Sequence, residues 1–331
     1  MVKNRISIEQ GSGGEEMSKL IKEFSSNFYR GNWKYFDDDG AIFSDNCFEK
    51  KICFTTDSYV VDPIEFRGGN IGDLAICGTI NDLLVMGADP IGISLSFIIE
   101  EGLSREVFDR IVKTIESLSL KLKIPIVTGD TKVVEKGGVD KIIINTSGVG
   151  LVDRVIDSEL EVGDKIIVSG GIGEHGIALL SDRFDFETSI NTDSKALIDE
   201  MRDVKSLIKF AKDSTRGGIA GVLNEIANKK EVNLEIVNKD IPIKNEVKSA
   251  CKLFGFDPLS IACEGRVVLI CSKKNSEDVL LKLKKYNKDA SIIGEVIEKN
   301  KDLSSGLVLL ETQYGKRIVE VPKGKIVPRI C

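Results

Sequence analysis

Residues 91–99 alternate between apolar and small side chains, and this alternation restricts the fold more than any other stretch. Its apolar members are Ile91, Ile93, Leu95, Phe97 and Ile99. A period of two predicts a strand with one buried face. Helical patterning at 71–87 stops before it at Pro90, and an amphipathic helix with Ser104 as its N-cap is predicted at 104–123. A half-buried strand between two helices requires a fold that combines sheet and helix.

Further strands and helices continue this mixture along the chain. We expect strands at 51–56, 124–128, 141–146, 165–169 and 266–271, and helices at 176–183, 195–212 and 217–228. The strands at 124–128 and 141–146 are each expected to lead into a polar or glycine turn. A chain of 331 residues predicts two domains of ordinary size, with a boundary near 151–163. The expected fold class is α+β or α/β in two units.

The charge and the apolar pattern exclude several classes of protein. The net charge is −6 and no long basic run offsets it, which argues against a nucleic-acid partner. No apolar stretch reaches the roughly 20 residues that span a bilayer. Residues 1–10 also lack the apolar core of a signal peptide. We therefore expect a cytoplasmic protein with no membrane partner.

Cysteine and histidine limit the available chemistry. The seven cysteines include no CxxC pair, and an odd number without a secretion signal indicates reduced thiols. His175 is the only histidine, so a histidine-rich metal site is excluded and a Ser-His-Asp mechanism would depend on that residue alone. We interpret His175, at the start of a helix, as a structural hydrogen-bonding residue. The chemistry must then come from carboxylates, lysines, backbone amides or a thiol.

Aspartates beside small residues are the most informative side chains. They are Asp39 in a DDGA run, Asp57 after the strand at 51–56, Asp82 inside an apolar helix, Asp130 in a GDTK run and Asp213 before a helix. A carboxylate inside an apolar helix needs a partner, because burying an unpaired charge is costly. Carboxylate oxygens suit Mg²⁺, which bridges to nucleotide phosphates, and glycine turns supply N–H groups to phosphate. Together these residues predict a metal–nucleotide site.

The same residues allow plainer interpretations. Each aspartate alone is explained as well by a cap, a turn or a solvated charge. No GxxxxGK[ST] pattern is present, which argues against a P-loop fold. Cys331 is either the accidental end of a frayed terminus or a thiol on an extended tail, which spans roughly 25 Å from Gly324.

The motifs quoted above, with several others, resemble one family over nearly the whole chain. The matching segments are GSGGEEMSKLI at 11–21, DDGA at 38–41, TTDSYVVDP at 55–63, GGNIGDLAICGTINDLLVMGADP at 68–90, FIIEEGL at 97–103, VTGDTKVV at 127–134, NTSGVG at 145–150, STRGGIAGVLNEIA at 214–227, FDPLSIACEG at 256–265 and PRIC at 328–331. They are similar to the hydrogenase maturation factors of the HypE family. That family belongs to the superfamily of aminoimidazole ribonucleotide synthetase and selenophosphate synthetase.

The resemblance implies a two-domain α+β fold of the aminoimidazole ribonucleotide synthetase type. It implies a mobile segment at 1–36, an ATP-binding α+β domain at 37–155 that pairs in a homodimer, a second α+β domain at 156–318 and a flexible tail at 319–331. The implied activity is the ATP-dependent dehydration of a thiocarbamate on Cys331 to a thiocyanate. The carbamoyltransferase HypF would load the thiol, and the HypC–HypD complex would receive the cyano group for the iron of a [NiFe]-hydrogenase.

The resemblance also assigns roles to individual residues. Asp39, Asp82 and Asp213 match the Mg²⁺-binding aspartates of the superfamily. Contacts to the ATP are implied for Gly11, Gly13, Gly14, Asp57, Gly129, Asp130, Thr131 and Gly148. Lys132 and Glu264 match the pair that handles the amide protons, and Cys331 matches the residue that holds the cargo. Cys263 is a departure, because asparagine more often precedes the glutamate.

Two other functions fit parts of the pattern. An enzyme of the same superfamily that acts on a free small molecule would not need Cys331, and a selenophosphate synthetase would usually have a reactive thiol near its N-terminus, where no cysteine precedes Cys47. A non-catalytic nucleotide-sensing scaffold would tolerate the loss of Lys132 and Glu264.

Overall fold

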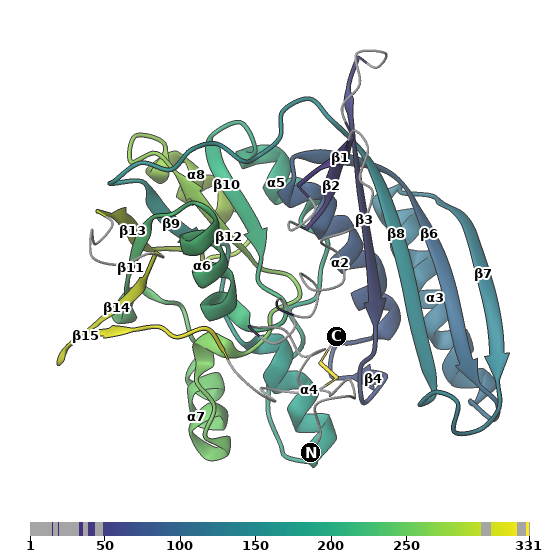
Figure 1. The fold of residues 1–331 in the computed structure, drawn as a ribbon. Helices are drawn as coiled ribbons and strands as arrows, with labels where there is room; N and C mark the ends of the chain where they lie inside the picture. Colours follow the sequence, from purple (N-terminus) through teal and green to yellow (C-terminus); the bar gives the residue numbers. More distant parts are fainter. Residues whose placement is uncertain are drawn as a thin grey trace.

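The computed structural model describes residues 15, 19, 33–35, 39–43, 49–298, 306–322 and 329–330. Within these residues the chain forms two large mixed sheets that lie side by side, with helices around them (Figure 1). Four residues with predicted roles, Gly11, Gly13, Gly14 and Cys331, lie outside the described residues.

The first sheet is built by residues 33–152. Its strand order is β1-β2-β3-β8-β6-β7, with β6 and β7 parallel and the other neighbours antiparallel. The strands are β1 (Trp33–Lys34), β2 (Ala41–Phe43), β3 (Lys51–Tyr59), β6 (Ala88–Glu100), β7 (Ile126–Val134) and β8 (Ile142–Val152). Helices α2 (Ile71–Val85) and α3 (Arg105–Leu122) pack on one face, and a small ribbon of β4 (Glu65–Phe66) and β5 (Gly69–Asn70) precedes α2.

The alternating segment at 91–99 lies in β6, between β8 and the edge strand β7. The strand predicted at 91–99 is confirmed within β6, where Ile93, Leu95 and Phe97 face the helices and are buried. Ile91 is 48% exposed, because the register against β8 shifts between Pro90 and Gly92. The predicted helices at 71–87 and 104–123 are also confirmed as α2 and α3.

The second sheet is built by residues 165–318. Its order is β10-β12-β9-β13-β11-β14-β15, with β11 and β14 parallel. The strands are β9 (Lys165–Val168), β10 (Ile208–Asp213), β11 (Asn233–Val237), β12 (Val267–Cys271), β13 (Ser291–Ile297), β14 (Val308–Thr312) and β15 (Gly315–Ile318). The helices are α4 (Glu174–Phe184), α5 (Ile198–Val204), α6 (Gly218–Lys229), α7 (Asn245–Phe254) and α8 (Ser276–Lys284), with 3-10 turns η2 (Asn238–Asp240) and η3 (Pro258–Ser260).

Both faces of the second sheet are covered at strand β12. Every residue of β12 is buried, because Val268 and Ile270 pack with α6 while Val267, Leu269 and Cys271 pack on the opposite side. That opposite side shares one hydrophobic cluster with α2 and β6 of the first sheet. The two sheets are therefore joined by a common core.

Three sequence-based expectations about local structure are wrong. The helix expected at 195–212 is α5 followed by strand β10, because pairing with β12 buries Ile208 and Phe210 and overrides the helical propensity of the segment. The turns expected after residues 128 and 146 are absent, since β7 continues to Val134 along β6 and β8 continues to Val152 between β3 and β6. The strand expected at 51–56 extends beyond Asp57 to Tyr59, so Asp57 lies within β3.

Among the described residues, none of the helices combines the length and the apolar character needed to cross a membrane.

Candidate active site

Three aspartates from distant parts of the chain meet where the two sheets join. Asp39 precedes β2, Asp82 lies on α2 and Asp213 ends β10. One carboxylate oxygen from each lies within 4.8 Å of the others. Asp82 and Asp213 are buried, and Asp39 is partly exposed. We call these three residues the acidic cluster.

The acidic cluster holds more negative charge than its protein partners balance. Burial raises the pKa of Asp82, and the charges of Asp57, Asp213 and Asp39 raise it further. The Thr55 hydroxyl, which donates to Asp82 Oδ2 at 2.7 Å, acts to lower the pKa of Asp82. Burial and then the charge of Asp39 likewise raise the pKa of Asp213. Hard oxygen donors held this close suit a divalent cation such as Mg²⁺.

Lys212 supplies part of the missing positive charge. Its ammonium group forms an ion pair with Asp39 and lies 3.4 Å from Glu225. Burial works to lower the pKa of Lys212, but the nearby carboxylates outweigh burial and raise it. One lysine therefore stays charged beside three carboxylates. Sequence patterns did not identify Lys212, whose only signal is its place next to Asp213.

Asp57 lies beside the acidic cluster on the same face of β3 as Thr55. The Tyr59 hydroxyl donates to Asp57 Oδ2 at 3.0 Å, and Tyr59 is in turn within 3.3 Å of Thr79. Asn145 donates to the backbone carbonyl of Asp57 at 2.7 Å. The orientation of Asp57 is thus set by buried and half-buried side chains, so that its charge acts on the cluster.

Glu264 approaches the acidic cluster from the loop before β12. Burial raises its pKa well above the usual range, and Asp213 and Asp193 add to the rise, while Arg216 opposes it. Among the described residues, no hydrogen-bond partner reaches its Oε1 atom. An uncommitted carboxylate oxygen with a raised pKa is suited to accept a proton.

The backbone of Glu264 is held from two sides. Its N–H donates to Asp193 Oδ1 at 2.8 Å, and Asn81, next to Asp82 on α2, donates to its carbonyl at 3.3 Å. Cys263 turns its thiol away to the Gly173 N–H, 3.2 Å distant. The position of Glu264 therefore depends on Asn81 and Asp193 rather than on the residue before it. Sequence reasoning missed Asp193, because nothing local distinguishes it.

Lys132 and its neighbours lie elsewhere. Lys132 pairs with Ile98 of β6 and so lies on the face of the sheet that α2 and α3 leave uncovered, whereas Asp57 lies on the covered face. Its ammonium group contacts Asp130, and both side chains are exposed. From β7 to β3 the sheet has three strand spacings, about 14 Å. Within one chain, the structure does not bring Lys132 to Glu264.

Two of the predicted nucleotide-contacting residues, Gly129 on β7 and Gly148 on β8, are required by the packing of neighbouring elements. Gly129 and Thr131 lie on β7, where a Cβ at Gly129 would come within 2.3 Å of the Leu95 carbonyl oxygen. A Cβ at Gly148 would lie 2.8 Å from Thr79 and 2.9 Å from Leu83 of α2. Both glycines therefore permit close contact between elements, and neither lies in a turn.

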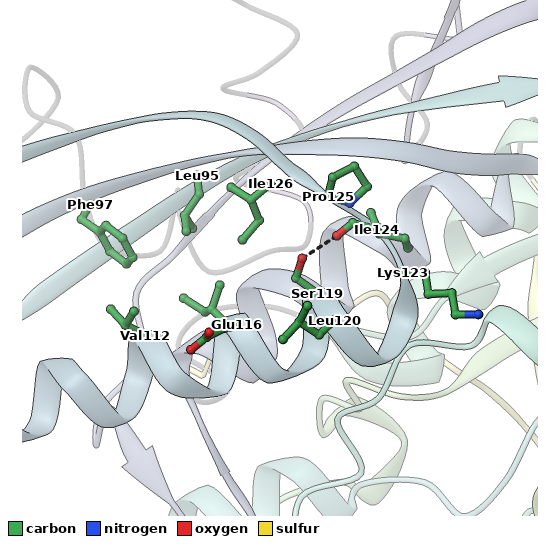
Figure 2. A pocket seen from close by; sticks show the side chains of 11 residues that line it. Leu95, Phe97, Val112, Glu116, Ser119, Leu120, Lys123, Ile124, Pro125 and Ile126 are labelled. Atoms are coloured by element: carbon green, nitrogen blue, oxygen red, sulfur yellow. Dashed lines mark hydrogen bonds between the residues drawn. The ribbon is translucent and has the colours of Figure 1, made fainter.

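A cavity of about 650 Å³ lies apart from the acidic cluster, between α3 and strands β6 and β7. Figure 2 shows its wall of apolar side chains, including Leu95, Phe97 and Ile126, with Ser119 donating to the Ile124 carbonyl. The ionisable side chains in its lining are Glu116 and Lys123. It lacks the converging polar groups that catalysis requires, so the acidic cluster with Glu264 is the better candidate site.

Comparison with protein-family models finds two matches in sequence order. Residues 37–152 match the N-terminal domain of AIR synthase related proteins, and residues 161–304 match the C-terminal domain. The two-domain fold predicted from the resemblance is confirmed by these matches and by the solved structures below.

Individual relatives are similar over the full length. The chain is 38% identical to carbamoyl dehydratase HypE of Rhizobium leguminosarum bv. viciae, with 99% of this chain and 95% of the relative covered. The crystal structure of a HypE–HypF complex superimposes with a TM-score of 0.82 at 39% identity, covering 92% of this chain and 99% of the solved one. A crystal structure of HypE in complex with ATP gives a TM-score of 0.81 at 32% identity, covering 98% and 100%.

Proposed function

Because this chain belongs to the HypE family of carbamoyl dehydratases, we propose that it uses ATP to dehydrate a carbamoyl group held on its own Cys331. The product is a thiocyanate, which supplies the cyanide ligands of a [NiFe]-hydrogenase iron. The observation that supports this most directly is the acidic cluster beside Glu264, since it joins a group of carboxylates suited to Mg²⁺ to a proton acceptor.

The nucleotide site of the proposal is the acidic cluster with Asp57. A HypE relative has been crystallised with ATP. Asp39, Asp82 and Asp213 offer oxygen donors within 4.8 Å of one another, and their uncompensated charge fits Mg²⁺. When bound, Mg²⁺ neutralises phosphate charge during phosphoryl transfer. Gly11, Gly13, Gly14, Asp130, Thr131 and Gly148 stay predictions as nucleotide contacts.

The chemistry takes place in two steps. The carbonyl oxygen of the thiocarbamate attacks the γ-phosphorus of ATP, and ADP leaves with the electrons of the broken bond. Glu264 then takes a proton from the nitrogen, the C–O bond breaks with its electrons going to phosphate, and loss of the second N–H proton completes the C≡N bond. The thiocarbamate loses the elements of one water, whose oxygen leaves in phosphate.

We propose that Lys132 acts in the active site of a second subunit. Lys132 lies on the uncovered face of the first sheet, whereas the acidic cluster lies at the covered face. Strand β7 is also about 14 Å from β3 across the sheet. The uncovered face also exposes Phe54 and Ile98. We infer that a homodimer covers this face and that Lys132 of one protomer steadies the charge that develops in the site of its partner.

Two partners belong to the proposed reaction. The solved HypE–HypF complex supports HypF as the carbamoyltransferase that loads Cys331. The HypC–HypD complex would accept the cyano group, because a thiocyanate on a tail needs an acceptor that holds the iron.

The test is intact-protein mass spectrometry of the full chain after incubation with HypF, carbamoyl phosphate and ATP. We expect a carbamoyl adduct on Cys331 that loses one water when this chain is supplied with Mg²⁺ and ATP. Cys331→Ser is the control and should bind ATP without forming the adduct. An adduct that persists with Mg²⁺ and ATP would contradict the dehydratase proposal and favour the scaffold. An unmodified tail would favour a small-molecule enzyme.

A further inference from the structure

The two described residues before Cys331 are docked on the body of the protein. The carbonyl oxygen of Arg329 accepts hydrogen bonds from the Asp62 N–H at 3.1 Å and from the Arg183 guanidinium at 2.8 Å. The carbonyl oxygen of Ile330 accepts from His175 Nε2 at 2.8 Å. Both successive carbonyls of the tail are therefore bound by groups of the body. We call Asp62, His175 and Arg183 the tail clamp.

The side chain of Ile330 fixes the register of this docking. It is 5% exposed and belongs to the hydrophobic cluster that joins the two sheets. The absence of a side chain at Gly176 makes room for it, since a Cβ there would lie 3.3 Å from Ile330 Cδ1. Outside the cluster, the Arg329 guanidinium donates to Asp140. A slip of one residue would take Ile330 out of its apolar site.

His175 is arranged for this task in its neutral form. A carbonyl oxygen can only accept, so Nε2 bears the hydrogen, and Nδ1 accepts from the Thr192 hydroxyl at 2.8 Å. Burial lowers the pKa of His175, although Ile330 and Asp193 oppose the shift. Phe66 meets the ring edge-on, with the ring centroids 5.4 Å apart. The imidazole is thus held on two edges and one face.

The tail clamp and Glu264 are positioned by neighbouring residues. Thr192 orients His175, and the next residue, Asp193, accepts the N–H of Glu264 at 2.8 Å. Ser194 N–H donates to Thr192 Oγ1 at 3.1 Å and closes the turn. Cys331 follows Ile330 directly in the sequence, one Cα spacing of about 3.8 Å further on. The segment 192–194 therefore links the residue that binds the Ile330 carbonyl to the residue that holds the Glu264 backbone.

We propose that His175 and Arg183 are positioning residues, which hold the backbone of residues 329 and 330 so that the group on Cys331 is presented to the acidic cluster and Glu264. This inference rests on the proposed function. Neither residue exchanges a proton with the cargo. Among the described residues the tail is held by hydrogen bonds, the Arg329–Asp140 ion pair and the buried Ile330 side chain, none of them covalent, so the tail can leave the body for loading by HypF.

The experiment separates loading from dehydration in the full chain. Carbamoylated protein is prepared with HypF, then given Mg²⁺ and ATP, and the loss of one water is followed by intact mass. Ile330→Glu changes the tail and leaves the body intact, with Ile330→Val as its matched control. His175→Leu removes the donor, and His175→Gln restores an N–H that can reach the Ile330 carbonyl. Hydrogen exchange of the Asp62 amide reports docking without any chemistry.

We expect Ile330→Glu and His175→Leu to slow dehydration by at least about tenfold, while loading by HypF proceeds at the wild-type rate. Ile330→Val and His175→Gln should recover most of the rate. The Asp62 amide should exchange faster in the two impaired variants. If His175 served folding alone, His175→Gln would not be expected to restore the rate of dehydration.

Two results would overturn the clamp. One is dehydration at the wild-type rate in Ile330→Glu, whatever happens to exchange at Asp62. The other is unchanged exchange at Asp62 in that variant. If instead the wild-type adduct never loses water, the proposed function fails, and the exchange measurement alone then decides whether the tail docks through these residues.

Discussion

The acidic cluster and the tail clamp both place polar groups at the junction of the two sheets, but they balance those groups differently. In the acidic cluster, Asp82 and Asp213 are buried with other carboxylates close by, and Lys212 offsets only part of the charge. In the tail clamp, both ring nitrogens of His175 have partners, and Arg183 holds two carbonyls. In the proposed function a cation balances the remaining charge of the cluster, whereas the clamp is occupied by residues 329 and 330 of the same chain.

The acidic cluster and the tail clamp therefore differ in how much free energy they cost the folded protein. Buried like charges raise the free energy of the folded protein, and a bound cation then recovers that energy as affinity. The groups of the clamp are hydrogen-bonded without repelling one another, so the tail can be released at a modest cost. Substitutions in the two regions should therefore have different effects on activity and on stability.

Asp82→Asn should have opposite effects on activity and on stability. Removing one carboxylate of the cluster should lower the dehydration rate by about 10³-fold, because phosphate charge is no longer neutralised. In metal-free buffer the same change should raise the melting temperature, because mutual repulsion is relieved and Thr55 can still donate to the amide oxygen. Thermal melts with and without Mg²⁺-ATP measure both effects. Asp199→Asn, which changes an exposed carboxylate, is the control. A lower melting temperature for Asp82→Asn in metal-free buffer would show that the carboxylates of the cluster do not destabilise the fold.

Glu264→Gln should stop the reaction after loading. General-base catalysis contributes about 10²- to 10⁴-fold, so dehydration should slow within that range while ATP still binds. The carbamoyl adduct should accumulate in the mass spectrum. Glu277→Gln, in the first turn of α8, serves as the control. Normal turnover of Glu264→Gln would assign proton removal to another group.

Mixed dimers test the position of Lys132. Lys132→Ala alone should slow dehydration about tenfold, the effect of losing roughly 1.4 kcal/mol of charge stabilisation. A heterodimer of Lys132→Ala and Glu264→Gln subunits should regain activity, because one of its two sites then has both intact residues. A mixture no more active than its parents would place Lys132 outside the partner's site.

The smallest effect concerns pH. Burial holds the pKa of His175 below its ordinary value, so the unfolded chain takes up a proton more readily than the folded protein. The free energy of unfolding should therefore fall as pH drops below about 6.5, by at most about 1.4 kcal/mol per pH unit. The gap in melting temperature between wild type and His175→Gln should narrow from pH 7.5 to pH 5. If the difference in melting temperature instead grows as the pH falls, His175 is not held in its neutral form.

Much of the cluster could be predicted from the sequence, because its members break local rules. A charge inside an apolar helix marks Asp82, and small neighbours mark Asp39 and Asp213. The alternation at 91–99 predicts β6 for the same reason, since its pattern is local. The full lengths of β3, β7 and β8 depend on pairing with distant strands, which no local pattern encodes.

The remaining features depend on contacts between distant residues. Strand β10 was predicted as helix because its lysines and alanine favour helix, while its burial against β12 is a tertiary effect. His175 and Ile330 are 155 residues apart. The location of Lys132 on the uncovered face follows from the register of β7 against β6, which the GDTK pattern does not contain.

The hydrophobic cluster shared by the two sheets decides which part of the enzyme can move. Separating the sheets would expose its apolar side chains to water, at about 25 cal/mol for each Å². Domain opening of the kind that admits substrates in hinged enzymes is therefore expensive here. In the proposed function the cargo is attached to the chain, so the body would not have to open to receive it. Turnover would then depend on how often the tail leaves its docked position and returns.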